Sequence, residues 1–341
     1  MRKIFTAPLV SVVIPAYNAG DTIKRSIQSA LDQTYASREI IIVDDGSTDQ
    51  TLAVARECGS RIEVLEQPHH GPAVARNAGI SRARGELVAF LDSDDYWRPA
   101  FLGACVDALG RSSSLVAVST AGEVIDRNGR HTAFPRTLTT ADVETKFYRN
   151  GIEAFFDFWS KHDHIRTGNC TIRRSVLLEA GGQNEHLRLG EDLELWALLA
   201  TYGQWAYIPD QLWVCDSVRA TANTGWTKKY AERRRLCPTV QDWQRRVLPR
   251  LGEVDGPGFK RVRGRIAAVF AHNHVLGGNS VLARSIVAEY GAEMPTVWSA
   301  QLLRMGDRLG GLAWSASCLL IRCREHQKAW ALRMRNLRIP G

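Results

Sequence analysis

Three carboxylates within four residues, Asp92, Asp94 and Asp95, are the side chains of this sequence best placed for chemistry. They follow the apolar run Leu87–Leu91, which has the composition of a buried strand. Burying carboxylates this close together is costly unless a cation or hydrogen-bond donors offset their repulsion. Oxygen ligands of this type suit Mg²⁺ or Mn²⁺, which joins one or two carboxylates to substrate phosphates. Capping of the next helix would account for only one of the three, so the sequence predicts a metal–phosphate site.

A second acidic pair, Glu191-Asp192, follows Gly190 and lies at the start of a helix predicted for residues 192–202. Acidic side chains in the first turn of a helix are stabilised by the helix dipole. Simple capping is therefore one interpretation of this pair, and participation in a reaction is the other.

Polar loops also follow the first two predicted strands. The mostly β-branched run Val10–Ile14 precedes Pro15-Ala16-Tyr17-Asn18, and Glu39–Val43 precedes the loop Asp44–Asp49. Ligands of open α/β sheets bind at the carboxyl ends of the strands. We therefore expect these two loops and residues 92–95 to line one ligand site.

Helical patterns lie between these strands. Apolar residues recur at helical spacing within residues 21–31, a third strand is predicted at 62–65, and an Ala-rich helix runs from Pro72 to near Gly85. Repeated βαβ units of this kind predict an α/β fold whose mainly parallel sheet has helices on both faces.

The alternation of strands and helices weakens after residue 119. Asn128-Gly129 predicts a hairpin, and a helix predicted over 139–160 carries aromatic residues that we interpret as core packing rather than an acceptor platform. The last part of the chain shows only helical patterns. We expect a ligand-binding domain over residues 1–225 and a basic α-helical region over 226–341.

Four motifs can be interpreted together: SVVIPAYN (11–18), IIIVDDGSTD (40–49), HGPAVARNAGI with GELVAFLDSDD (70–95), and GEDLELW (190–196). In order and spacing they resemble the inverting glycosyltransferases of family 2, along roughly residues 8–215. The resemblance implies the Rossmann-like A-type glycosyltransferase fold (GT-A), a nucleoside-diphosphate-sugar donor, a divalent metal and single-displacement transfer to an acceptor hydroxyl. It also implies a role in bacterial surface polysaccharide or glycoconjugate synthesis, with a glycan or lipid-linked glycan as acceptor.

The resemblance also indicates which residues bind the nucleotide-sugar donor. Asp45 corresponds to the acceptor of a hydrogen bond from the uracil imide, which implies a UDP-sugar. Arg76 corresponds to a position near the diphosphate or donor sugar, and Asp92 to a ribose contact. A turn-forming Asp44 and a helix-surface Arg76 are the plainer alternatives. The implied nucleotide-sugar-binding set is Pro15, Tyr17, Asn18, Asp45, Arg76 and Asp92.

The resemblance also assigns the metal and the base. Asp94 corresponds to the metal ligand, a task that Asp95 could share, and water and two phosphates would complete the coordination of Mg²⁺ or Mn²⁺. The metal would neutralise charge on the leaving diphosphate. Asp192 corresponds to the general base that takes the proton of the acceptor hydroxyl, and Glu191 to a residue that orients it or binds the acceptor. Because adjacent carboxylates are hard to separate without geometry, Glu191 stays the alternative base.

Composition limits the class of protein. With 341 residues, 45% hydrophobic and 23% charged, the chain is neither disordered nor collagenous. Its seven cysteines include no Cys-x-x-Cys pair, and the N-terminus has no signal-peptide pattern, so we expect a reducing, cytoplasmic compartment. His162-x-His164 and His272-x-His274 have chelating spacing but no further ligands, so we interpret them as core or surface histidines rather than zinc ligands.

The charge is unevenly distributed. Residues 225–341 hold 21 Lys and Arg against 8 Asp and Glu, a net +13, which leaves −5 for residues 1–224. A basic tail indicates an anionic partner such as a membrane surface, nucleic acid or phosphorylated substrate. An apolar stripe in this tail predicts either an interfacial helix at the inner face of the cell membrane or a helix packed on the catalytic domain. Its residues are Leu309, Leu312, Ala313, Ala316, Leu319 and Cys323.

Rival functions fit less of the sequence. A nicotinamide dehydrogenase needs a Gly-x-Gly-x-x-Gly turn after its first strand, where PAYNAGD has one glycine. A nucleotidyltransferase acting on a sugar phosphate would share the paired acids and the metal, but the usual phosphate loop is missing. A nucleic-acid-binding protein that uses the basic region would leave both acidic clusters unexplained, so no nucleic acid is expected as a partner.

Overall fold

The computed structural model describes residues 7–126, 128–138, 146–147, 152–216, 234–252 and 256–336. Its contacts divide the chain into two compact units. The first unit comprises residues 1–186, 190–226 and 246–254, and the second comprises residues 187–189, 227–245 and 255–341. The domain boundary expected after residue 225 stays a prediction.

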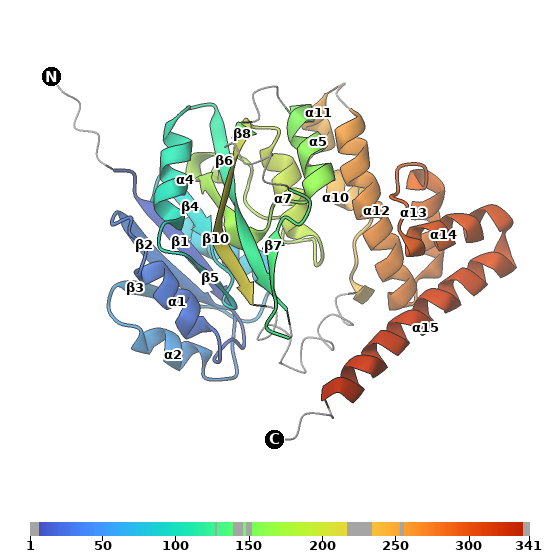
Figure 1. Cartoon of the computed structure of the whole chain (residues 1–341), viewed down its shortest axis with the longest axis horizontal. Helices are drawn as coiled ribbons and strands as arrows, with labels where there is room; N and C mark the ends of the chain where they lie inside the picture. Colours follow the sequence, from blue (N-terminus) through green and yellow to red (C-terminus); the bar gives the residue numbers. More distant parts are fainter. Residues whose placement is uncertain are drawn as a thin grey trace. The chain divides into compact units, whose positions relative to one another are not determined.

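The first unit begins with alternating strands and helices (Figure 1). In chain order these are β1 (Val10–Ala16), α1 (Ile23–Leu31), β2 (Arg38–Asp44), α2 (Thr51–Glu57), β3 (Ile62–Glu66), α3 (Pro72–Arg82) and β4 (Leu87–Phe90). β1 pairs in parallel with β2 and β4, and β2 pairs in parallel with β3. The neighbouring residues Val12 and Val13 point to opposite faces of β1 and are both fully buried, as expected where both faces are covered.

The rest of the sheet is mixed in direction. Its strands are β5 (Asp95–Trp97), β6 (Leu115–Ile125), β7 (His131–Phe134), β8 (Lys146–Phe147), β9 (Cys170–Arg173) and β10 (Gln204–Asp216). The sheet runs in the order β3-β2-β1-β4-β9-β6-β10-β5, with β7 beside β6 and β8 beside β10. β9 is antiparallel to both β4 and β6, while β6 and β10 are parallel to each other.

The predicted α/β fold and its βαβ units are confirmed, and the sheet is less uniformly parallel than expected. A helical crossover returns the chain to the same edge of a sheet and so makes the next strand parallel. The chain reverses its direction at the hairpin between β6 and β7, and β9, which follows a short 3₁₀ turn at Thr167–Asn169, is antiparallel to both β6 and β4. The sequence pattern predicted neither this strand at Cys170–Arg173 nor its direction.

The remaining helices of the first unit are α4 (Phe101–Gly110), α5 (Ile152–His162), α6 (Arg174–Glu179), α7 (Glu191–Leu199) and α11 (Leu248–Leu251). The N-cap of α4 is Ala100, so neither Asp94 nor Asp95 caps this helix, and Asp95 instead begins β5. The capping alternative for these carboxylates is therefore wrong.

The aromatic helix is shorter than predicted over 139–160. It is described from Ile152, β8 occupies Lys146–Phe147, and residues 139–145 and 148–151 lie outside the described residues. Phe155 and Trp159 are buried, in agreement with core packing.

The second unit is helical in its described residues. Its helices are α10 (Val240–Gln244), α12 (Pro257–Gly277), α13 (Ser280–Tyr290), α14 (Trp298–Leu309) and α15 (Gly311–Asn336), and α15 packs against α12 and α14. No helix in the described part of the chain combines the length and apolar character needed to cross a bilayer.

The position of α3 depends on a glycine at its contact with β1. A Cβ atom on Gly79 would lie 2.3 Å from Val13 Cγ1, closer than two carbon atoms can pack. The missing side chain thus lets the helix that carries Arg76 and Asn77 approach the sheet closely.

We expect Gly79→Ala to lower the free energy of unfolding by about 1–3 kcal/mol, the usual cost of overpacking a core. Gly103→Ala is the matched control, because a Cβ atom on Gly103 of α4 would have no neighbour within 4 Å. Alanine favours a helix, so the control should be stabilised by roughly 0.5–1 kcal/mol. Urea denaturation would measure both, and a Gly79→Ala protein as stable as the control would contradict the close-contact argument.

Candidate functional site

The loops that follow β1 and β2 are tied together by hydrogen bonds. Asn18, which has a left-handed φ of 49°, donates its backbone N–H to Ser47 Oγ at 3.0 Å, and its Oδ1 accepts from the Thr48 N–H at 2.8 Å. Asp45 donates its N–H to the Ala16 carbonyl at 2.8 Å. The carboxyl ends of these two strands therefore form one rigid edge. Pro15 is buried inside β1 and Tyr17 is partly buried beyond it.

Asp45 is held on this edge by the segment that precedes α3. Its carboxylate accepts from Gln67 Nε2 at 2.7 Å and from the backbone N–H groups of residues 70 and 71 at 2.9 and 2.8 Å. The Nδ1 atom of His69 lies 2.8 Å from the same carboxylate. The imidazole of His69 also stacks on the ring of Tyr17, with 3.9 Å between centroids. Asp44 forms a turn by accepting from the Ser47 N–H, as its plainer interpretation suggested.

Arg76 lies at the centre of the acidic residues. Its guanidinium is buried and donates to Asp92 Oδ1 at 2.8 Å. Burial by itself lowers the pKa of Arg76, but the negative charges of Asp92, Glu191 and Asp192 outweigh it and hold the pKa above its ordinary value. Two acidic segments separated by a hundred residues in the sequence therefore act on one cation. The helix-surface interpretation of Arg76 is wrong.

The three carboxylates after β4 have different surroundings. Asp92 and Asp94 are partly buried, whereas Asp95 is buried and accepts a hydrogen bond from Trp213 Nε1 at 2.8 Å. Desolvation, helped by the charge of Asp92, raises the pKa of Asp94 to about 6. Desolvation also raises the pKa of Asp95 well above its ordinary value, and its acidic neighbours add to this effect. Arg25 fixes the loop by donating to the carbonyl of Asp94 at 3.0 Å.

The second acidic pair lies in the first turn of α7. The helix begins at Glu191, after Gly190 in a left-handed conformation with a φ of 76°. Glu191 is buried and Asp192 is partly buried. The N-terminal end of a helix favours negative charge, so this turn is a favourable place for two adjacent acidic side chains.

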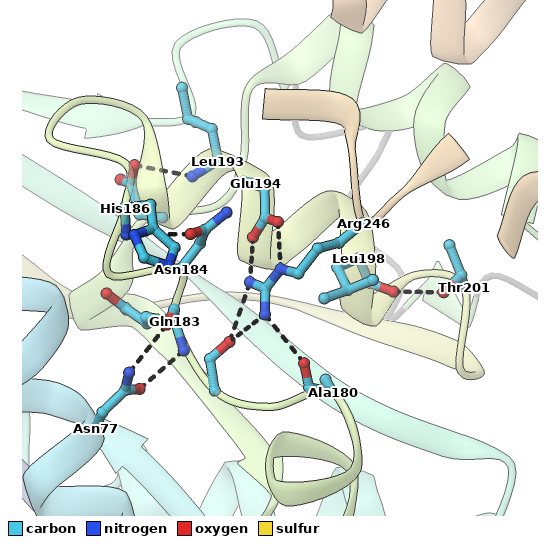
Figure 2. Close-up of polar contacts among 12 residues, drawn as sticks. Asn77, Ala180, Gln183, Asn184, His186, Leu193, Glu194, Leu198, Thr201 and Arg246 are labelled. Carbon is cyan, nitrogen blue, oxygen red and sulfur yellow. Dashed lines mark hydrogen bonds and ion pairs between the residues drawn. The ribbon is translucent and has the colours of Figure 1, made fainter. Parts of the chain in front are cut away.

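Several residues near this turn were not identified from the sequence. Figure 2 shows Asn77 of α3 bonded to the backbone of Gln183, and Arg246 bonded to Glu194 of α7. Gln183 in turn accepts from Arg76 Nη1 at 3.3 Å. Asn77 follows Arg76 in the ARN motif, which is a signal that could have drawn attention to it, whereas Arg246 lies outside every motif.

The residues present suit a metal bound together with a diphosphate. In the described ranges no three His, Cys, Asp or Glu side chains are grouped as a metal site of their own. Magnesium and manganese ions commonly take one or two carboxylates and complete their shell with water and phosphate oxygens. Asp94, with Asp92 beside it, matches that incomplete donor set, and a bound cation would offset the desolvation that raises the pKa of Asp94. His164 is buried among aromatic rings, as a core histidine would be.

Comparison with protein families gives one match. The model described as "Glycosyl transferase family 2" matches residues 11–181, which is half of the chain. The match includes β1, the loops after β1 and β2, α3 and the three carboxylates after β4, and it ends before α7.

Known proteins resemble the same region. The succinoglycan biosynthesis protein ExoU of Rhizobium meliloti (strain 1021) is 34% identical over 199 residues, which are 55% of this chain and 56% of ExoU. A chondroitin synthase of Pasteurella multocida (strain Pm70) is 38% identical over 129 residues, 37% of this chain. This chain spans only 13% of that synthase and 18% of a chondroitin synthase of Escherichia coli.

Solved structures share the fold across almost the whole chain. TarS 1-349 of S. aureus in complex with UDP-GlcNAc aligns with a TM-score of 0.55 at 19% identity, covering 94% of this chain and 92% of the TarS 1-349 chain. The mannosyltransferase PcManGT of Pyrobaculum calidifontis, in complex with GDP-Man and Mn²⁺, aligns with a TM-score of 0.55 at 19% identity, covering 96% and 88%. The predicted GT-A fold with a helical C-terminal region is thereby confirmed.

The raised pKa of Asp94 predicts a pH-dependent stability in the metal-free protein. Between its ordinary pKa of 3.8 and about 6, the folded state holds a proton on Asp94 that the unfolded chain has lost. Stability should therefore fall as the pH rises through this window. Asp94→Asn removes the group, so its melting temperature relative to wild type should increase between pH 4 and pH 7.

Thermal melts in EDTA would measure this difference. The control is Asp21→Asn, which removes an exposed carboxylate and should follow the wild-type curve. If the difference between Asp94→Asn and wild type were constant over the pH range, Asp94 would not titrate with a raised pKa.

Proposed function

Because this chain belongs to glycosyl transferase family 2, we propose that it is an inverting glycosyltransferase, a hexosyl- or related transferase that moves a sugar from a nucleoside-diphosphate-sugar to an acceptor hydroxyl. The observation that carries the proposal is the position of Arg76 between two acidic segments. One of these, residues 92–95, is suited to the donor diphosphate and its metal. The other, Glu191-Asp192, is suited to the acceptor, so the two halves of a transfer reaction would meet at one place.

The donor is a UDP-sugar in this proposal. Asp45 would bind the base, Tyr17 would stack on it, and Pro15 and Asn18 would hold the loop around the nucleotide. Support comes from the rigidity of this edge, where Asp45 is buried and oriented by several donors. Further support comes from the fold shared with TarS, whose structures contain UDP or UDP-GlcNAc. Since His69 covers Tyr17 here, the base would enter beside or in place of that imidazole.

The cofactor is Mg²⁺ or Mn²⁺, with Asp94 as its main protein ligand. Asp92 is shared between Arg76 and the ribose or metal, and Asp95 is the secondary ligand because Trp213 already occupies one of its oxygens. When bound, the metal supplies positive charge that stabilises the diphosphate as it leaves. Arg76 would add the positive charge of a buried guanidinium on the same side.

Asp192 is the proposed general base. The oxygen of the acceptor hydroxyl attacks the anomeric carbon as its proton passes to the Asp192 carboxylate, and the bond from that carbon to the diphosphate oxygen breaks. Attack from the side opposite the leaving group inverts the anomeric configuration. Glu191 is more buried than Asp192, which suits it to orient the base or bind the acceptor.

The acceptor belongs to a surface polysaccharide or another glycoconjugate in this proposal. The relatives carry names from succinoglycan, chondroitin and teichuronic acid synthesis, and WfaP of Escherichia coli, 50% identical over 91 residues, transfers glucose to a sugar on diphosphoundecaprenol by its name. A lipid-linked acceptor would place the enzyme at the inner face of the cell membrane.

The apolar stripe supports this location. Within the second unit, α15 turns Trp314, Cys318 and Ile321 inward, whereas Leu312 is 92% exposed and Leu319 61% exposed. The stripe is therefore not packed within this unit, and exposed Arg308 and Arg324 accompany it. Exposed leucines next to arginines are the composition of a surface that contacts anionic lipid headgroups.

The test of the transfer proposal is a panel of nucleotide sugars assayed with Mg²⁺ and Mn²⁺, followed by Asp192→Asn. This variant keeps the shape of the side chain but cannot accept a proton at neutral pH. Turnover should fall by at least ~10²-fold, the lower end for a positioned general base. The affinity for the donor should change little, because the base acts only as the hydroxyl attacks. The product should carry the inverted configuration.

Glu191→Gln serves as the matched control at the adjacent carboxylate. If Asp192→Asn transfers sugar normally while Glu191→Gln is inactive, the base is Glu191. If both variants are fully active, the pair only caps α7 and the proposed mechanism is wrong. If no nucleotide sugar is hydrolysed, transferred or bound by the wild-type protein, the proposed function itself is wrong.

The membrane proposal predicts that Leu312→Asp/Leu319→Asp abolishes flotation with anionic vesicles at low salt. The control is Val269→Asp/Val281→Asp, which places the same two charges on exposed valines of α12 and α13. The control should still float, since only the stripe inserts among the lipids. Equal loss in both variants would mean that net charge alone binds the vesicles, and a wild-type protein that ignores them would exclude the membrane contact.

A further inference from the structure

We infer that Arg246 is a positioning residue that fixes the first turn of α7 against the loop carrying Gln183. The inference rests on the proposed function, in which Asp192 or Glu191 in that turn is the base. A base is effective only when its oxygen lies where the attacking hydroxyl needs it, and a misplacement of about 1 Å can cost ~10²-fold in rate. The first turn of α7 has an unusual means of holding that position.

The carboxylate of Glu194 is fully buried two residues after Asp192. It is paired with Arg246 in two parallel hydrogen bonds, from Nε to Oε1 at 2.6 Å and from Nη2 to Oε2. Glu194 is thus a third acidic residue in this turn. Its carboxylate is paired with the Arg246 guanidinium rather than exposed to solvent. The bidentate pairing fixes both the distance and the rotation of the turn.

Arg246 uses its remaining donors on the neighbouring loop. Nη1 donates to the carbonyls of Ala180 and Gly182 at 3.1 and 3.2 Å, and Nη2 also lies 3.2 Å from the Gly182 carbonyl. Every nitrogen of the guanidinium is therefore engaged, as Figure 2 shows. A lysine has one nitrogen and could not hold a carboxylate and two carbonyls in this geometry.

The loop held by Arg246 leads directly to the donor side. Gly182 is in a left-handed conformation, and a Cβ atom there would lie 2.5 Å from Asn77 Oδ1. The next residue, Gln183, bonds to Asn77 through its backbone and to Arg76 through its side chain. Arg246 is thus connected to Arg76 through the adjacent residues Gly182 and Gln183. Arg76 in turn donates to Asp92.

The course of the chain supplies an independent argument. After leaving the first unit at residue 226, the chain returns to it only for residues 246–254 before joining the second unit again. This returning segment contacts both ends of α7. Arg246 pairs with Glu194 in the first turn, and Arg250 lies over the Tyr202 ring at 3.7 Å and donates to Thr201 Oγ1 at 2.9 Å. Only the Arg246 contact reaches the turn that carries Glu191 and Asp192, whereas the Arg250 contacts lie just beyond the last residue of α7.

The two contacts allow a matched experiment. Arg246→Met should lower kcat by ~10²-fold while the affinity for UDP changes far less, because the base is displaced but the loops after β1 and β2 are intact. Arg246→Lys should recover only part of kcat. Arg250→Met removes the contact at the far end of α7, and it should lower the melting temperature slightly with kcat unchanged.

The double variant Glu194→Met/Arg246→Met separates positioning from stability. Removing both charges avoids a lone buried carboxylate, so its melting temperature should return to the wild-type range. Its kcat should stay low, because no guanidinium joins α7 to the loop. Hydrogen exchange should show faster amides at residues 191–194 in the double variant than in Arg250→Met.

Recovery of kcat together with stability in the double variant would overturn the inference, since Arg246 would then serve the fold alone. So would an Arg250→Met protein that loses as much kcat as Arg246→Met. These results differ from a failure of the proposed function. In that case the wild-type protein would transfer no sugar, or Asp192→Asn and Glu191→Gln would both be fully active.

Discussion

The arrangement of the candidate site depends on keeping one arginine charged inside the first unit. Arg76 loses most of its hydration on burial, and a buried cation is tolerated only where anions and acceptors surround it. Asp92 provides a direct hydrogen bond, and Glu191 and Asp192 add their charge. The loop after β4 and the first turn of α7 are consequently drawn to α3. Each acidic segment is in turn easier to bury because Arg76 is there.

The proposed donor side and the proposed acceptor side of the site are built in different ways. The donor side uses the ends of parallel strands, where Asn18 and Asp45 are fixed by short hydrogen bonds between neighbouring loops. The acceptor side uses a helix whose direction must be set from outside the sheet. In our inference Arg246 supplies that support, by pairing with Glu194 from a segment remote in sequence. The family match covers the loops after β1, β2 and β4 and stops before α7.

The mixed part of the sheet also serves the site. Since β10 runs antiparallel to β5, it brings Trp213 beside Asp95, and the indole donates to that carboxylate. Asp95 is thereby turned toward the interior, which leaves Asp92 and Asp94 as the partly buried acids of this loop. One strand of the sheet thus distinguishes carboxylates that look equivalent in the sequence.

The sequence by itself determined the βαβ elements of the first unit and the polar loops at the ends of their strands. A sheet buried on both faces needs continuous apolar strands, so these runs, alternating with helical spacing, predict the βαβ order. The polar loops that follow the parallel strands must then meet at the carboxyl ends of the strands. Tertiary structure alone decided what depends on contacts distant in sequence. It placed β9 antiparallel between β4 and β6, gave Asp95 surroundings different from those of Asp94, and joined Arg246 to Glu194. Periodicity describes only neighbours along the chain, whereas a buried charge is paired with whichever residue the fold brings within hydrogen-bond distance.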